Sequence, residues 1–285
     1  MSLTLIIANK AYSSWSFRPW ILMRHFGIPF DEITIPLAQN DTQARIKSFS
    51  PSGKCPALRD GETLIWDSLS IIEYLVELHP QMPLWPAKRE ARAQARSLAA
   101  EIHSGFMSLR THLPMNMRRA VRKRELTPNV SADIARIEEA LEQTKAAFGQ
   151  AGAFLFNEFS AADAMFAPLV NRFHVYDVGV RPSTRQYMDT VMALPAWQEW
   201  QAQALAEPWT IDKYETADSD TGELPSLTSN AKELAVVGQY EKQGTHYVMY
   251  SDGSVEVRSE HTVFHFKTMA ELKAFLESEG RIPQE

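Results

Sequence analysis

Cysteine is almost absent from this sequence, because Cys55 is the only one among 285 residues. A disulfide within the chain is therefore excluded, since each bridge joins two cysteines. No run of about 18 apolar residues is present, so we predict no membrane-spanning helix. The first ten residues lack a basic leader before a long apolar stretch, and we expect no signal peptide. A cytoplasmic protein is the expectation that follows.

An excess of basic residues is also lacking, since the net charge is −6 at pH 7. A surface that binds nucleic acid is usually basic, so we predict no nucleic-acid partner. The basic run at 118–124 is interpreted as a solvated helix end. His246, His261 and His265 lie in one C-terminal region, but a metal site needs further ligands at suitable spacing, and we predict no metal.

Hydrophobic patterning over residues 1–80 indicates a small α/β domain. The strands are predicted at Leu3–Ala8, Phe30–Ile35, Ala57–Asp60 and Thr63–Trp66, and the helices at Trp15–Phe26, Asp41–Phe49 and Ser68–Leu78. The order β-α-β-α-β-β-α is typical of a thioredoxin-like domain.

The rest of the chain predicts two further domains. A proline-rich linker at His79–Pro86 precedes an all-helical domain over residues 87–215. Its helices are predicted at Ala87–His112, at Ser131–Phe148 with Ser131 as N-cap, at Ser160–Tyr176, and in two segments before Leu205. A second linker, Thr216–Asn230, leads to a small β-β-β-α module over residues 221–285, whose strands are predicted at Thr245–Tyr250, Ser254–Val257 and Val263–Phe266 and whose helix is predicted at Met269–Glu277.

Three short motifs carry candidate chemistry. Ser13, Ser14 and Ser16 lie at a helix start, where free N–H groups and the helix dipole favour a negative charge such as a thiolate. Serine is also a preferred N-cap, and capping alone is the simpler reading of this motif. In the segment KCPAL, the backbone of Cys55 next to Pro56 offers pairing groups to a peptide if that bond is cis, and Lys54 offers a charge to a carboxylate.

The third motif is WDSLSIIEYL, in which Asp67 and Ser68 begin another helix. Both residue types are good caps, which again is the simpler reading. The functional reading is a pocket for an amino-acid head group. Asp67 would then take the ammonium, and Ser68 with the helix N–H groups would take the carboxylate.

These three motifs, in this order and spacing, resemble those of the glutathione transferase superfamily. The segment Phe159–Asp163 resembles the capping box that this family carries on a buried helix of its second domain. The resemblance covers about residues 1–210 and is nearest to the serine-type zeta class. Zeta proteins carry Ser-Ser-Cys-Ser where this chain has Ser-Ser-Trp-Ser, so Trp15 stands in the place of the cysteine.

The resemblance implies glutathione as co-substrate, a homodimer, and a role for each matching residue. Ser13 takes the place of the catalytic serine and Ser14 flanks it. Tyr12 is a candidate for the same role, ranked behind Ser13, because other classes of the family use a tyrosine near this position. The glutathione-binding residues are then Gln39, Lys54, Cys55, Pro56, Asp67 and Ser68, and Asp67 is shorter than the usual Glu or Gln. The expected acceptor pocket between the two domains contains Tyr12, Met107, Arg110 and Arg172, with Met115, Met117, Phe166 and Phe173 as further candidates.

The activity that the resemblance implies is attack of the glutathione thiolate on an electrophilic small molecule. A zeta-type, glutathione-dependent isomerase of the maleylacetoacetate kind is a second hypothesis. A third is a binding scaffold without catalysis, in which the module at 221–285 faces the partner. Ser13, Pro56, Asp67 and Ser68 together favour a working glutathione site, because a scaffold has no chemical need for them.

Overall fold

The computed structural model describes residues 3–215, 236–242, 245–251, 253–258, 263–266, 268–270 and 272–273. The chain divides into two compact units, Met1–Ser219 and Asp220–Glu285. The first unit contains both the sheet domain and the helical domain, and the linker predicted over Thr216–Asn230 lies outside the described residues. Within the described part of the chain, no helix is long and apolar enough to cross a membrane.

The first unit begins with a four-stranded sheet and three helices. These elements are β1 (Leu3–Ala8), α1 (Ser14–His25), β2 (Phe30–Ile35), α2 (Thr42–Phe49), β3 (Ala57–Asp60), β4 (Thr63–Trp66) and α3 (Ser68–Leu78). In the sheet order β2-β1-β3-β4, β1 and β2 are parallel and the other pairs are antiparallel. The predicted thioredoxin-like domain is confirmed, and all four strands have their predicted bounds.

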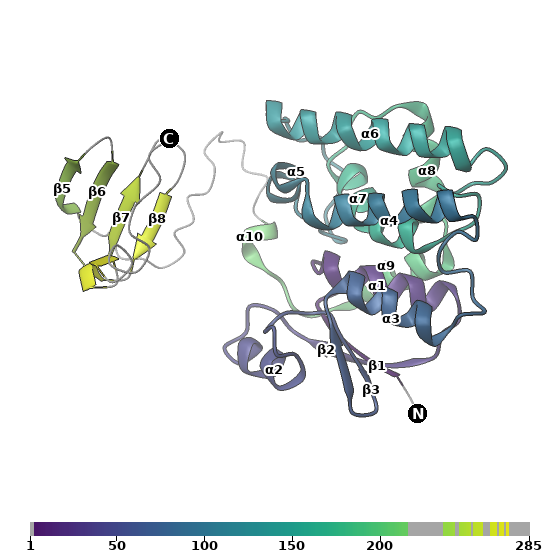
Figure 1. The fold of residues 1–285 in the computed structure, drawn as a ribbon, viewed down its shortest axis with the longest axis horizontal. Helices are drawn as coiled ribbons and strands as arrows, with labels where there is room; N and C mark the ends of the chain where they lie inside the picture. Colours follow the sequence, from purple (N-terminus) through teal and green to yellow (C-terminus); the bar gives the residue numbers. More distant parts are fainter. Residues whose placement is uncertain are drawn as a thin grey trace. The chain divides into compact units, whose positions relative to one another are not determined.

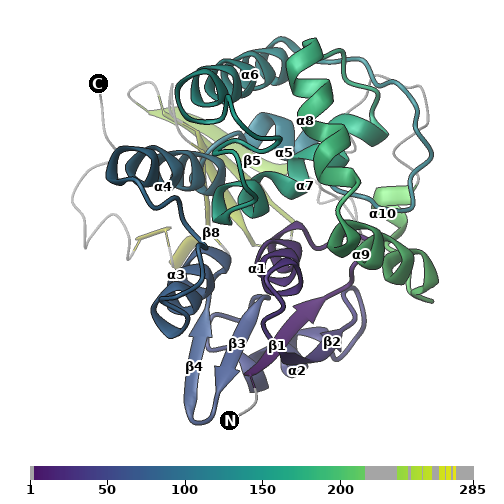
Figure 2. The same ribbon diagram turned by 90° about the vertical axis from the view of Figure 1, so that its right-hand side faces the viewer.

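Helices cover both faces of this sheet, as Figures 1 and 2 show. Side chains alternate along a strand, so neighbouring residues of β1 point to opposite faces. Leu5 and Ile7 belong to the large core that also contains residues of α1 and α3. Ile6 instead packs in a small cluster with Ile46 of α2. The first and third helices therefore lie between the sheet and the helical domain.

The helical domain has seven described helices. They are α4 (Arg89–Ser104), α5 (Met107–His112), α6 (Pro128–Phe148), α7 (Ala161–Val175), α8 (Pro182–Met192), α9 (Pro195–Ala206) and α10 (Asp212–Glu215). The single helix predicted over Ala87–His112 is wrong, because α4 ends before Gly105 and Phe106. Gly105 has an extended backbone with a ψ of −170°, and Phe106 has a left-handed φ of 61°. A continuing helix allows neither feature.

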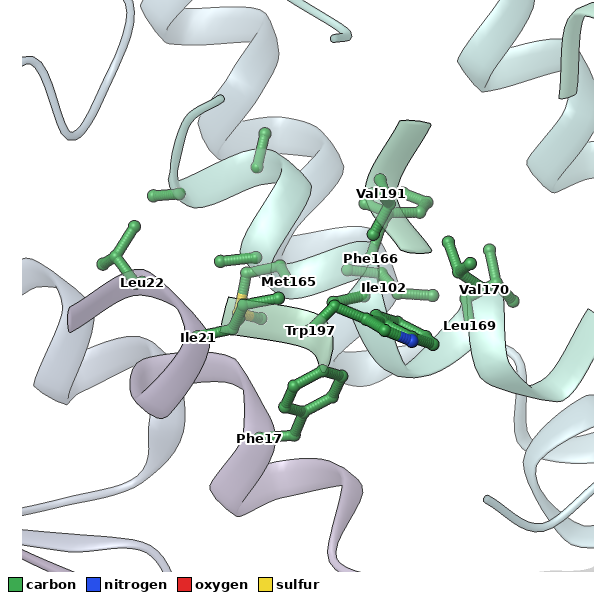
Figure 3. Packing of buried hydrophobic residues seen from close by; sticks show 14 of the residues in the cluster. Phe17, Ile21, Leu22, Ile102, Met165, Phe166, Leu169, Val170, Val191 and Trp197 are labelled. Carbon is green, nitrogen blue, oxygen red and sulfur yellow. The ribbon is translucent and has the colours of Figure 1, made fainter. Parts of the chain in front are cut away.

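Packing of α1 against α7 and α9 joins the two domains (Figure 3). The ring of Phe17 on α1 lies 4.8 Å from the Trp200 ring and 5.3 Å from the Trp197 ring on α9. At the start of α7, the predicted capping box is present, since Asp163 accepts the Ser160 backbone N–H at 2.9 Å.

Helix α6 begins three residues earlier than predicted, at Pro128. Thr127 is the N-cap, and its hydroxyl oxygen accepts the N–H of Val130 at 3.4 Å. Proline suits the first helical position because its missing N–H would have no partner there. Ser131, predicted as the cap, lies inside the helix and donates its hydroxyl to the Thr127 carbonyl oxygen.

Replacing Thr127 with alanine should therefore lower the free energy of unfolding by about 1 kcal/mol, because an N-cap is lost. Replacing Ser131 with alanine is the matched control, and we expect a change within about 0.5 kcal/mol at this exposed helical position. Urea unfolding of both variants measures the difference. Equal losses would show that the cap is not at Thr127.

The second unit contains a four-stranded antiparallel sheet in the order β5-β6-β7-β8. Its strands are β5 (Val236–Lys242), β6 (Thr245–Tyr250), β7 (Val255–Arg258) and β8 (Val263–Phe266). The prediction missed β5, so the module has four strands before its helix and not three. Helical residues are described at 269–270 and 272–273, within the predicted helix. His261 lies outside the described residues.

Candidate functional site

One edge of the first sheet gathers the predicted site residues. The register pairs Ala8 at the end of β1 with Ile35 at the end of β2. Near the same edge, Ala57 at the start of β3 pairs with Ile6 and with Trp66 at the end of β4. The segments that follow β1, β2 and β4 and the segment that precedes β3 therefore emerge together. These segments contain Ser13, Gln39, Cys55 and Asp67.

Ser13 is the N-cap of α1. Its hydroxyl oxygen accepts the Ser16 N–H at 3.4 Å, and the hydroxyl donates to the Ser16 Oγ atom at 2.8 Å. That Oγ atom also accepts the N–H of Ala8 at 3.1 Å, which joins the helix start to β1. The hydroxyl of Ser14, which is buried, has no hydrogen-bond partner among the described residues. Both serines thus lie where the N-terminus of α1 favours a negative charge.

The loop before β3 contains a cis peptide bond between Cys55 and Pro56. The backbone N–H and C=O of Cys55 form no hydrogen bond with any other described residue. Burial raises the pKa of the Cys55 thiol to about 11, so this thiol is protonated at neutral pH. Lys54 and Gln39 are exposed, and the Gln39 amide donates to the Leu37 carbonyl oxygen at 3.3 Å.

Asp67 is the N-cap of α3. Its Oδ1 atom accepts the N–H groups of Leu69 at 2.9 Å and Ser70 at 3.4 Å. Its backbone has a positive φ of 76°, which is uncommon for a residue other than glycine. The next residue, Ser68, is buried, and its hydroxyl has no partner among the described residues. A buried hydroxyl without a partner is a group that a polar ligand could satisfy.

Two side chains that the sequence analysis missed, those of His103 and Arg18, complete this region. His103 of α4 places its Nε2 atom 3.3 Å from the Asp67 Oδ2 atom, and its ring meets the Trp15 ring edge-on at 5.0 Å. The guanidinium groups of Arg18 and Arg110 lie 4.1 and 4.8 Å from the centre of the Trp15 ring. His103 is distant from Asp67 in the sequence, so no local pattern signals their contact.

Comparisons with known proteins bear on this arrangement. Two family models match the chain, the glutathione S-transferase N-terminal domain at residues 12–78 and the C-terminal domain at residues 120–201. The maleylacetoacetate isomerase of Rattus norvegicus is 30% identical over 193 residues, which are 65% of this chain and 87% of that protein. The zeta-class glutathione S-transferase of Euphorbia esula is also 30% identical, over 65% of this chain and 84% of that protein. The chain belongs to the glutathione S-transferase family.

This family uses glutathione as a co-substrate. A glutathione transferase homologue from Burkholderia, solved with bound glutathione, shares the fold with a TM-score of 0.57 and 23% identity. That likeness covers 73% of this chain and 100% of the other chain. The comparisons thereby confirm the resemblance to zeta-like glutathione transferases that the serine, KCPAL and WDS motifs predicted.

The residues expected in the acceptor pocket of a glutathione S-transferase differ in how exposed they are. Met107 is exposed at the start of α5, and Arg110 is half-buried beside Trp15. Tyr12 and Arg172 are buried instead. The Tyr12 hydroxyl donates to Glu215, and burial together with this hydrogen bond raises the pKa of Tyr12.

Arg172 donates to the carbonyl oxygens of Leu113 and Arg110, and burial lowers its pKa to about 10. In this structure Tyr12 and Arg172 therefore make internal contacts, and neither is presented at an exposed surface. The further candidates Met115, Met117, Phe166 and Phe173 are buried core residues. Of the predicted acceptor set, Met107 and Arg110 are the residues that retain exposed surface.

Proposed function

We propose that this protein binds reduced glutathione at the sheet edge and transfers its thiolate to an electrophilic small molecule. The thiol proton of glutathione leaves to solvent, and the sulfur forms a bond to an electrophilic carbon. At that carbon either a π bond breaks and the adduct takes up a proton from solvent, or a leaving group departs with its electron pair. Two groups that have no hydrogen-bond partner among the described residues support this most directly, namely the buried Ser68 hydroxyl and the backbone of Cys55. Family membership supplies the co-substrate.

Each part of the tripeptide has a complementary group. The γ-glutamyl ammonium would meet Asp67, and its carboxylate would meet Ser68 with the N-terminal N–H groups of α3. The cysteinyl part would pair in a strand-like way with the backbone of Cys55, which is unpaired in the described structure. Lys54 and Gln39, both exposed, would reach the glycyl carboxylate.

Ser13 is the group proposed to stabilise the thiolate. Its hydroxyl would turn from the Ser16 Oγ atom to the sulfur, and Ser16 would keep its hydrogen bond from the N–H of Ala8. The helix N-terminus adds electrostatic stabilisation of the negative sulfur. Cys55 is a poor nucleophile because burial raises its pKa to about 11.

An isomerase is the second candidate, favoured by a Rattus norvegicus relative named "Maleylacetoacetate isomerase" and a Caenorhabditis elegans relative named "Probable maleylacetoacetate isomerase". Both reactions begin with the same thiolate, so the proposed glutathione site serves either. Turnover of a cis-diene diketo acid without loss of glutathione would identify the isomerase, whereas consumption of glutathione would identify transfer.

We also propose a homodimer, as the family resemblance implies.

Calorimetric titration of the full chain with reduced glutathione tests the proposal. We expect saturable binding in the micromolar to low millimolar range. The matched control ligand is the α-linked peptide Glu-Cys-Gly, which has the same composition but does not present a free amino-acid head group at its end. No saturable binding, or equal binding of both peptides, would contradict the proposed site and favour the scaffold hypothesis.

A further inference from the structure

His103 reaches from the helical domain to the Asp67 carboxylate. The two oxygens of that carboxylate have different partners: Oδ1 accepts N–H groups of α3, and Oδ2 lies 3.3 Å from His103 Nε2. His103 lies in the last turn of α4, and its ring rests edge-on against Trp15 of α1. Three helices, α1, α3 and α4, therefore meet at this one imidazole.

The contact indicates which nitrogen of His103 carries the proton. A carboxylate oxygen accepts, so the Nε2 atom must donate. The Nδ1 atom is buried and has no partner among the described residues. A second proton there would be a buried donor without an acceptor, which is costly. The neutral imidazole with its proton on Nε2 is thus the form that fits.

We propose that His103 is a positioning residue that holds Asp67 Oδ2 toward the γ-glutamyl ammonium of glutathione. This inference rests on the proposed glutathione site. Asp67 has a short and partly exposed side chain, so an oxygen without a second anchor would rotate away from the ligand. The backbone N–H groups of α3 anchor Oδ1 alone, and His103 supplies the other anchor from a different domain.

The charges around His103 make this arrangement sensitive to acid. Burial lowers the pKa of His103 from its usual 6.5, Asp67 opposes this shift, and Arg18 of α1 with Arg110 of α5 add to it. Above that pKa the imidazole is neutral, and the full negative charge of Asp67 faces the ammonium. Below it, an imidazolium beside Asp67 competes with the ammonium, so glutathione affinity should fall as the pH falls through this lowered pKa.

Two substitutions of His103 test separately the contribution of its N–H donor and the contribution of its ring packing. His103→Phe keeps a ring against Trp15 but removes the donor, and we expect the Kd for glutathione to rise about tenfold, which is ~1.4 kcal/mol. His103→Gln keeps an N–H donor near the position of Nε2, and we expect it to restore most of the affinity at pH 7.5. Arg96→Leu is the matched control, because it breaks a different contact between α4 and α3, the ion pair of Arg96 with Glu73, away from Asp67.

A pH series distinguishes positioning from a merely structural role. In the wild type, the calorimetric Kd should be constant above pH 7 and rise about tenfold towards pH 5, whereas in His103→Gln it should change less than threefold. In the double variant of His103→Phe with Asp67→Ala, the loss should equal that of Asp67→Ala alone. The inference would be overturned if the wild type bound glutathione and His103→Phe bound it with the same Kd. It would also be overturned if the losses of His103→Phe and Asp67→Ala added up in the double variant. Absence of wild-type binding would contradict the proposed function instead.

Discussion

Replacing Ser13 with alanine should lower kcat/KM for glutathione conjugation by about 100-fold. The hydroxyl of Ser13 is proposed to donate to the thiolate, and a hydrogen bond to a charged group contributes about 1.5–3 kcal/mol, or about 10- to 150-fold. The affinity for glutathione itself should change much less, because the tripeptide is held by other groups. The pKa of the bound glutathione thiol should rise by about 1–2 units, and the ultraviolet absorbance of the thiolate against pH measures it.

Loss of the N-cap is a separate consequence of Ser13→Ala and needs its own control. Ser13 caps α1, so the variant should also lose about 1 kcal/mol of stability. Thr127→Ala loses an N-cap of the same kind in α6, away from the sheet edge, and should keep full activity. If Ser13→Ala retains normal turnover and thiol pKa, the thiolate role moves to Ser14, whose hydroxyl has no partner among the described residues.

Tyr12 is a weaker alternative to Ser13 for a structural reason. Its hydroxyl donates to Glu215 and also accepts the N–H of Ile211 at 3.3 Å. Its ring lies 5.7 Å from the Tyr214 ring. A hydroxyl held in this way would have to break its contacts with the segment after α9 before it could meet a ligand. The sequence position next to Ser13 does not reveal this, because Tyr12 and Glu215 are far apart in the chain.

The parts of the fold that were predictable depend on local patterns. The strands of the first sheet are short apolar runs bounded by turn residues, and the helix α3 begins at the Asp67-Ser68 cap, so their bounds follow from neighbouring residues. The end of α4 at Gly105 was not predictable in this way. A lone glycine inside a helical pattern is often tolerated, and the extended backbone of Gly105 and the left-handed backbone of Phe106 are visible only in three dimensions.

The site also contains residues that local sequence predicts and residues that it does not. Ser13, Cys55 and Asp67 follow or precede strands of one sheet, so the topology brings them to one edge. His103 lies in a helix of the other domain, and its contact with Asp67 depends on how the two domains pack. Arg172 shows the converse, because its charge suggested an acceptor residue whereas tertiary packing buries it against carbonyl oxygens. Local sequence predicts which residues lie at the sheet edge but not what packs against them.

Replacing Asp67 with asparagine should raise the Kd for glutathione about 30-fold while the fold is retained. Asparagine caps a helix as well as aspartate does, and it tolerates a positive φ such as the 76° found here. The N–H groups of Leu69 and Ser70 therefore keep an acceptor. The negative charge that is proposed to meet the γ-glutamyl ammonium is lost. Because this carboxylate is partly exposed, the expected loss, ~2 kcal/mol, lies within the lower part of the range for hydrogen bonds to charged groups.

A glutathione analogue without the γ-glutamyl amino group gives the sharpest control for Asp67→Asn. Such a ligand has no ammonium, so it should bind the wild type weakly and the variant with nearly the same Kd. Calorimetry with both ligands and both proteins forms a thermodynamic cycle. Its coupling energy measures the ion pair between Asp67 and the ammonium. A 30-fold loss for glutathione with no loss for the analogue would assign the ammonium to Asp67. Equal losses for both ligands would show instead that Asp67 acts through the start of α3, and the head-group pocket would then have to be built around Ser68 alone.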